Sequence, residues 1–173
     1  MTDPLASAEI AAGSFHEAAH AVAAIELGMC EITVRIIPDR SMSGVQTDAD
    51  ISFACSALGN EPLWRTLQRR LTVMVAGPEW ELFSAVQSSR RQVLREQRAD
   101  RIAIVGVIRQ LRNLCAMRGR TLRNCIEDAW NEAAHIRGLR NGQLVTIALA
   151  LDASGSLTDS ELRALFAQGT GPS

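Results

Sequence analysis

The stretch from residue 16 to residue 20 reads His16-Glu17-Ala18-Ala19-His20, an H-E-x-x-H pattern. Side chains four residues apart lie one above the other on a helix. Both imidazoles can therefore reach one zinc ion, for which histidine is a common ligand. The glutamate between them can take a proton from a water molecule that the metal has acidified. The pattern predicts a zinc site with Glu17 as general base.

The flanking residues predict that this pattern lies on the first helix. Asp3 can cap that helix with Pro4 as its first residue, and Gly28 can end it. Ser14 and Glu17 also fit a capping box, which would make the glutamate part of a helix start. The residues before Ser14 already have helical character, so a new start there is unnecessary. The histidine spacing then favours a metal site over two histidines on a half-exposed face.

A zinc site of this kind needs a third protein ligand and one position open for water. Asp100 is the leading candidate because it begins the apolar face of a predicted helix, where a carboxylate is costly unless it is paired or bound to metal. It could instead cap its helix or pair with a neighbouring arginine. Glu96, Glu79 and Glu81 are reserve candidates, and His135 is expected to be an ordinary helix residue.

The segment after the first helix predicts a small β-sheet. Residues 31–37 are rich in β-branched residues and end at Pro38, which indicates a strand. Residues 44–47 could form a short partner strand, whereas residues 48–60 show no clear pattern. From residue 61 onward apolar residues recur at helical spacing, and Gly77-Pro78 is expected to interrupt or kink that helix.

The rest of the chain predicts only helices. One carries Asp100 and an apolar face, one spans residues 121–140, and a short one spans residues 142–151 after a turn at Asn141-Gly142. Thr158 and Glu161 form a capping box for a last helix through Phe166, and residues 169–173 are expected to be a disordered tail. The predicted fold class is α+β and predominantly helical, with an H-E-x-x-H helix, a small β-sheet and a C-terminal helical bundle. It would form a single domain over residues 1–168.

Charge, hydropathy and cysteine pattern argue against nucleic-acid-binding, membrane and secreted proteins. The chain has 173 residues and a net charge of −1, which implies no strong attraction to nucleic acid or membranes. The N-terminus lacks the pattern of a secretory signal, and no apolar run is long enough to span a bilayer. The four cysteines form no C-x-x-C pair, so free thiols in the cytoplasm are expected.

Arginines cluster between residues 88 and 101, at Arg90, Arg91, Arg95, Arg98 and Arg101. Acidic residues interrupt this cluster and no aromatic residues interleave with it. A solvated or protein-contacting face is therefore favoured over nucleic-acid binding.

The chain resembles the peptidase domain of the FtsH family of ATP-dependent zinc metalloproteases. Residues 16–22 resemble that family's H-E-A-G-H-A-hydrophobic helix, residues 33–38 its strand ending in I-I-P, and residues 44–47 the strand that follows. Residues 75–81 are a weakened version of a helix bearing A-G-R-x-A-E-E, and residues 125–166 resemble the C-terminal helices. Asp100 matches the family's aspartate ligand. The resemblance implies zinc held by His16, His20 and Asp100.

The chain also departs from that family. The family's A-G-H is Ala-Ala-His here, and its S-T-G-A loop is replaced by the arginine-rich residues 88–101. There is no Walker A pattern, so we expect the chain not to unfold substrates by itself. A separate unfoldase could serve as a partner, and because family members form rings, so could further copies of the chain.

The predicted function is a zinc-dependent endopeptidase that hydrolyses unfolded polypeptide. An extended substrate would lie beside the metal, paired to the edge of the strand at residues 33–37. The alternative is a non-enzymatic interaction or regulatory protein that retains the peptidase-like fold. The presence of Glu17 disfavours that alternative, because a purely structural metal site does not need this carboxylate. Neither nucleic acid nor a membrane is an expected partner.

Overall fold

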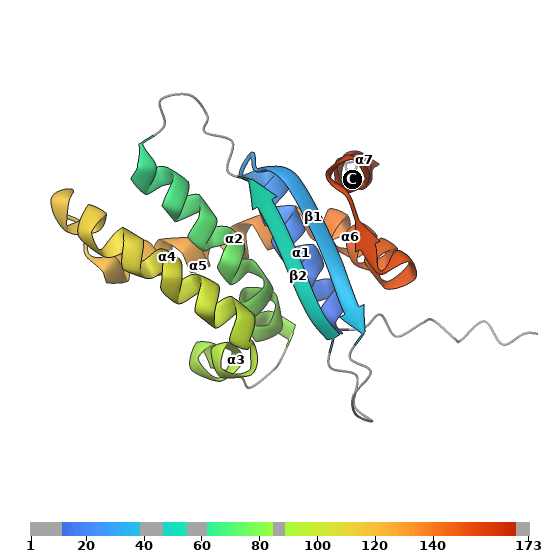
Figure 1. Cartoon of the computed structure of the whole chain (residues 1–173), viewed down its shortest axis with the longest axis horizontal. Coiled ribbons are helices and arrows are strands. Elements are labelled where there is room, and N and C mark those ends of the chain that lie inside the picture. Colours follow the sequence, from blue (N-terminus) through green and yellow to red (C-terminus); the bar gives the residue numbers. More distant parts are fainter. Residues whose placement is uncertain (1–11, 39–46, 55–61, 85–88, 169–173) are drawn as a thin grey trace, which may run out of the picture.

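The computed structural model describes residues 12–38, 47–54, 62–84 and 89–168 (Figure 1). In chain order the elements are α1 (Ala12–Glu26), β1 (Cys30–Pro38), β2 (Thr47–Ala54), α2 (Leu63–Ser84), α3 (Arg90–Glu96), α4 (Arg98–Met117), α5 (Leu122–Leu139), α6 (Asn141–Ser154), β3 (Ser156–Leu157) and α7 (Asp159–Gln168). This confirms the predicted α+β, predominantly helical class. Within the described ranges no helix is long and apolar enough to cross a membrane.

Helix α1 occupies the centre of the fold. Every residue from 16 to 24 is buried, and the alanines among them leave room for neighbours to approach on several sides. The sheet covers one side of α1, and α2, α5 and α6 pack against it elsewhere (Figure 1). As predicted, Gly28 follows the helix end, with a φ of 72° that favours glycine. The expected helix start at Asp3 lies outside the described residues.

The sheet has three antiparallel strands in the order β2-β1-β3. In β1, Ile32 and Val34 are buried while Thr33 and Arg35 are exposed, the alternation of a strand with one face on the core. The strand predicted at residues 31–37 is thus confirmed. Strand β3 was not foreseen, because two residues form a strand only through pairing with β1.

The second strand lies later in the chain than predicted. β2 begins at Thr47 and runs through residues 48–54, a segment that showed no pattern, while residues 44–46 lie outside the described ranges. The pairing extends from Cys30 opposite Ala54 to Pro38 opposite Thr47. Pairing with β1 therefore determines this strand more than its own sequence does.

Helix boundaries differ from the prediction at two places. Gly77-Pro78 does not interrupt α2, which continues to Ser84. The continuous burial of residues 71–79 offsets the backbone hydrogen bond that proline cannot make. Likewise, Asn141-Gly142 is not a turn but the start of α6, and only Arg140 separates α6 from α5.

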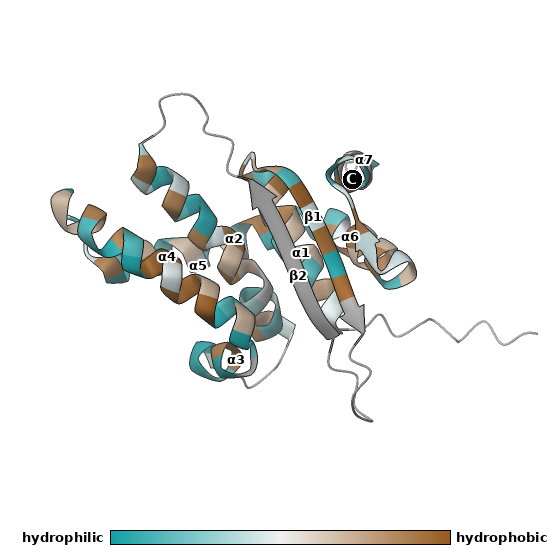
Figure 2. Ribbon diagram, viewed as in Figure 1, coloured by the Kyte–Doolittle hydropathy of each residue, from teal (hydrophilic) through white to brown (hydrophobic). Residues whose placement is uncertain are grey.

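Helices α4 and α5 have the amphipathic character expected from their apolar spacing. In α4 the buried residues recur every three or four positions, and Figure 2 shows hydrophobic and hydrophilic residues alternating along the helix. At the start of α7, Glu161 accepts hydrogen bonds from both the amide and the hydroxyl of Thr158. The bond from the Thr158 amide is one of the two that define the predicted capping box.

The C-terminal segment returns to the beginning of the chain. Ser14 Oγ donates a hydrogen bond to Asp152 of α6 at 3.0 Å, which is a different role from the capping box considered for it. Arg163 of α7 donates to the carbonyl oxygen of Met29 at 2.6 Å. α1 and β1 are therefore held between the α2–α5 helices and the C-terminal elements.

Candidate metal centre

The two histidines of α1 face each other through their Nε2 atoms, which are 3.1 Å apart. Both Nδ1 atoms are engaged elsewhere: that of His16 lies 2.7 Å from a carboxylate oxygen of Glu81, and that of His20 lies 2.6 Å from the carbonyl oxygen of Val73. Since carboxylate and carbonyl oxygens only accept hydrogen bonds, each Nδ1 carries the proton. In a neutral imidazole each Nε2 then presents a lone pair, the arrangement of a metal ligand.

Asp100 reaches the same point from α4. Its carboxylate oxygens lie 2.8 Å from Nε2 of His16 and 3.5 Å from Nε2 of His20. Zinc–ligand bonds of about 2.0–2.1 Å in a tetrahedron separate ligand atoms by about 3.3 Å. The three separations recorded here, 2.8, 3.1 and 3.5 Å, lie close to that value. The residues present therefore fit a zinc ion.

Gly77 forms the wall of this site on α2. A Cβ built on it would lie 2.5 Å from Nε2 of His16 and 2.5 Å from Nε2 of His20, closer than real Cβ atoms come. Any side chain at this position would fill the space between the two imidazoles. The sequence interpretation took Gly77 as a helix interruption, whereas the structure shows a close approach of two helices.

Glu17 is buried on α1 beside the histidines. Its Oε1 lies 3.8 Å from Nε2 of His16, and the ligating atoms of His16, Glu17 and His20 all lie within 4.8 Å of one another. Of the two carboxylates nearby, Asp100 makes the shorter contact and touches both histidines. Glu17 therefore lies next to the candidate ligand atoms, and by distance Asp100 is the better candidate for a third ligand.

The electrostatics of this cluster favour positive charge. Burial alone lowers the pKa of His16, but hydrogen bonds with Asp100 and Glu81 outweigh burial and raise this pKa to about 10. Burial alone raises the pKa of Asp100, but the two histidines outweigh it and hold this pKa well below its usual range. A cation between the histidines would be stabilised by the same carboxylates.

Neighbouring residues fix the two helices that form the site. The rings of Phe15 on α1 and Trp80 on α2 stack with centroids 5.0 Å apart, next to His16 and close in sequence to Gly77. Glu81 also accepts a hydrogen bond from Gln97 at 2.6 Å. The stacked rings limit how far α1 and α2 can shift relative to each other, and the Gln97 bond ties α2 to the junction of α3 and α4.

The other candidate ligands lie elsewhere. Glu79 binds Arg137 through two hydrogen bonds of 2.9 and 3.1 Å, and His135 is exposed. The side chain of Glu96 lies outside the described part of the structure. Glu81, a reserve ligand in the sequence interpretation, holds His16 by Nδ1 instead.

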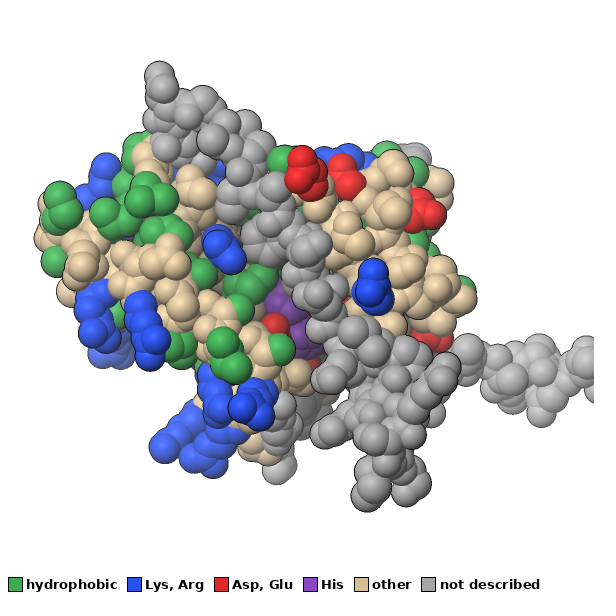
Figure 3. All heavy atoms as spheres, in the orientation of Figure 1, with side chains coloured by type: hydrophobic (Ala, Val, Ile, Leu, Met, Phe, Trp, Pro, Cys, Tyr) green, Lys and Arg blue, Asp and Glu red, His purple; other side chains and the backbone are tan. Residues whose placement is uncertain are grey.

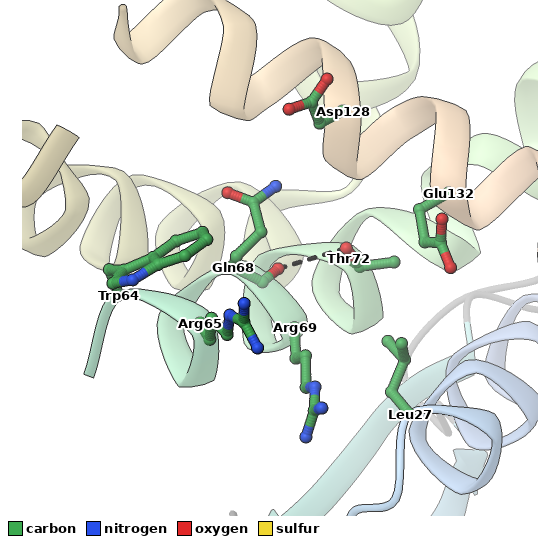
Figure 4. A pocket seen from close by; sticks show the side chains of 8 residues that line it. All are labelled: Leu27, Trp64, Arg65, Gln68, Arg69, Thr72, Asp128 and Glu132. Atoms are coloured by element: carbon green, nitrogen blue, oxygen red, sulfur yellow. Dashed lines mark hydrogen bonds between the residues drawn. The ribbon is translucent and has the colours of Figure 1, made fainter. Parts of the chain in front are cut away.

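The site reaches the surface. Figure 3 shows histidine atoms (purple) beside α4, and the Asp100 side chain is 15% exposed. A pocket of about 260 Å³ lies between α2 and α5, lined by Trp64, Gln68 and Asp128 among others, and none of the metal-centre residues lines it (Figure 4). Access to the histidines is thus separate from that pocket.

The chain matches no protein-family model, and no curated protein matches it. Support for a function therefore comes from the residues of this site.

Proposed function

We propose that the chain is a zinc-dependent endopeptidase that acts on unfolded polypeptide. The observation that carries this proposal is the convergence of three ligand atoms. Nε2 of His16, Nε2 of His20 and the Asp100 carboxylate lie 2.8–3.5 Å apart while both Nδ1 atoms are engaged by other acceptors. With three protein ligands the metal would keep room for water or substrate, as catalytic zinc sites do.

Each residue has a role in this proposal. His16, His20 and Asp100 would hold the metal, which when bound would acidify a water molecule and polarise the peptide carbonyl. Glu17 would accept the proton from the attacking water and then deliver it to the departing amine. Glu81 and the carbonyl of Val73 would keep the imidazole rings in the orientation that binding requires.

The substrate strand cannot pair with β1 as the sequence suggested. β2 covers one edge of β1 along its length, and on the other edge Val34 and Arg35 pair with β3 while the amide of Ile36 donates to Gly155. The outer edge of β2 faces the side on which α2 and α4 lie (Figure 1). We propose that an extended substrate pairs with this edge of β2, which brings it beside the metal centre.

Cleavage would depend on the substrate being unfolded. Laying an extended segment along β2 requires only a free strand, whereas extracting one from a folded protein requires work. We therefore expect slow cleavage of casein, none of tightly folded proteins, and no dependence on ATP. A separate unfoldase or self-association, and a cytoplasmic location, remain predictions.

The decisive experiment compares wild type, Glu17→Gln and His16→Ala in a gel time course on casein, with zinc content measured on the same samples. Glu17→Gln should keep zinc and lose cleavage by about 100-fold or more, because only the proton acceptor is removed. His16→Ala should lose both. If zinc-loaded wild type cleaves no unfolded substrate, the endopeptidase proposal is wrong and the interaction-protein alternative is favoured. Cleavage that survives in Glu17→Gln would refute the role of this glutamate.

A further inference from the structure

Two cysteines meet at the end of the helical layer that does not carry the metal centre. Cys115 lies in the last turn of α4 and Cys125 in the first turn of α5, and their Sγ atoms are 2.7 Å apart. Both residues are buried, at 5% and 1% exposure. The two sulfur atoms are close enough that a bond between them requires only a small movement of either side chain.

The surroundings hold both thiols in this position. Thr121 caps α5 by accepting a hydrogen bond from the amide of Asn124, and Arg120 pairs with Asp128 across the turn between the helices. Gln68 of α2 donates a hydrogen bond to the carbonyl oxygen of Cys125 at 2.7 Å. The contact is therefore part of a packed junction of α2, α4 and α5.

The pair is remote from the metal centre. Asp100 lies in the first turn of α4 and Cys115 in the last, so the two are separated by about 22 Å along the helix at 1.5 Å per residue. A covalent change at the cysteines would thus leave the zinc ligands in place. It would, however, act on the helix that carries the third ligand.

We propose that Cys115 and Cys125 form a reversible disulfide that links α4 to α5. With a low-molecular-weight disulfide as the oxidant, one thiolate attacks a sulfur of that molecule and releases one thiol. The second cysteine then attacks the resulting mixed disulfide and releases the other thiol. The net reaction converts two protein thiols and one small disulfide into one protein disulfide and two small thiols.

The environment of the thiols sets the rate of this reaction. Burial raises the pKa of the Cys125 thiol to about 11, and the hydrogen bond with Cys115 adds to this effect. Little thiolate is present at neutral pH, so oxidation should be slow and should accelerate with rising pH. Both thiols are buried in the packed junction, so the oxidant reaches them only when that junction opens locally.

The crosslink should stabilise the fold. The two cysteines are ten residues apart in sequence, and closing a loop of this size restricts the unfolded chain. We expect the midpoint of thermal unfolding to rise by about 5 °C on oxidation.

The test uses full-length protein carrying Cys30→Ser and Cys55→Ser, so that only Cys115 and Cys125 remain. It is incubated in glutathione redox buffers at pH 8 until its mass no longer changes. Mass spectrometry should show a loss of two hydrogens, and trypsin, which cuts after Arg118, Arg120 and Arg123, should release linked peptides carrying the two cysteines. A further Cys115→Ser change should abolish the link and yield only a glutathione adduct at Cys125.

Two results would overturn the proposal. One is protein that keeps both thiols free in the most oxidising buffer. The other is protein that gains glutathione at either cysteine without forming the link. Because the readout is mass and not activity, either result leaves the proposed peptidase function untouched.

Discussion

Two glutamates of α2, Glu79 and Glu81, are two residues apart and serve opposite purposes. Positions two apart on a helix point in nearly opposite directions. Glu79 turns toward α5 and forms a bidentate pair with Arg137, so its charge is neutralised within the protein. Glu81 turns toward α1, where it meets the imidazole of His16 and the amide of Gln97.

The difference is whether a buried carboxylate already has a positively charged partner within the protein. In the described part of the chain neither Glu81 nor Asp100 has an arginine among its contacts; both converge on histidine. A region whose carboxylates lack built-in cations needs a cation from elsewhere, either protons on the histidines or a metal ion. The Glu79 region should therefore respond to mutation as a structural pair, and the Glu81 region as a binding site.

The largest effect is expected from Gly77→Ala, because the added methyl group would lie 2.5 Å from both Nε2 atoms. Zinc binding and casein cleavage should be lost, while helical content by circular dichroism stays at the wild-type level. Gly106→Ala in α4 is the matched control, since a Cβ there meets nothing within 4 Å. It should keep zinc and gain about 1 kcal/mol of stability. Full zinc content in Gly77→Ala would show that the metal does not lie between these histidines.

The next largest effect on zinc binding is expected from removal of the proposed third ligand. Asp100→Ala should weaken zinc binding by more than about 100-fold, beyond the range usual for residues that only orient a ligand. Glu96→Ala should have little effect. Competition titration with a chromogenic chelator measures both. Equal affinities in the two variants would remove Asp100 from the ligand set and leave the histidine pair in place.

A smaller loss is expected for Glu81→Gln. The glutamine side chain can still accept a hydrogen bond from Nδ1 of His16. The substitution, however, removes the negative charge that makes the imidazole a better ligand. Zinc affinity should fall by about 10-fold, at the weak end of the range for such residues. The same chelator titration gives the value. No change would mean that Glu81 only packs against the ring.

The smallest effect on zinc is expected for Glu79→Gln, which should bind the metal like wild type. It should instead destabilise the fold by about 2 kcal/mol, because one buried partner of Arg137 is lost. Urea unfolding of the zinc-free protein provides the measurement. A zinc defect in this variant would contradict the separation of the two regions.

Local patterns in the sequence predict much of the fold, and they point to the residues that the structure brings together at the candidate metal centre. The histidine spacing predicts a shared helix face, and the β-branched run at residues 31–37 predicts a strand. Both depend only on residues that are close in sequence. Asp100 was singled out because a carboxylate on an apolar helix face needs a partner, and the structure brings it to both histidines.

Features that depend on how helices and strands pack against one another could not be predicted from the sequence. Gly77 looked like a helix breaker. Nothing in the sequence shows that α1 lies so close to it that there is no room for a methyl group. β3 exists only through its pairing with β1, and the meeting of Cys115 with Cys125 depends on the angle between two helices. A glycine inside a strongly apolar helical run was the one available signal for Gly77.

The return of α6 and α7 to the start of the chain has a consequence for synthesis. Ser14 bonds with Asp152 and Met29 with Arg163, across 138 and 134 residues. A ribosome releases α1 well before these partners. The helix that carries both histidines therefore reaches its native surroundings only after α6 and α7 have been synthesised. A chain stalled before α6 would hold both histidines on a helix that lacks part of its native packing, and the proposed activity would be absent until that packing forms.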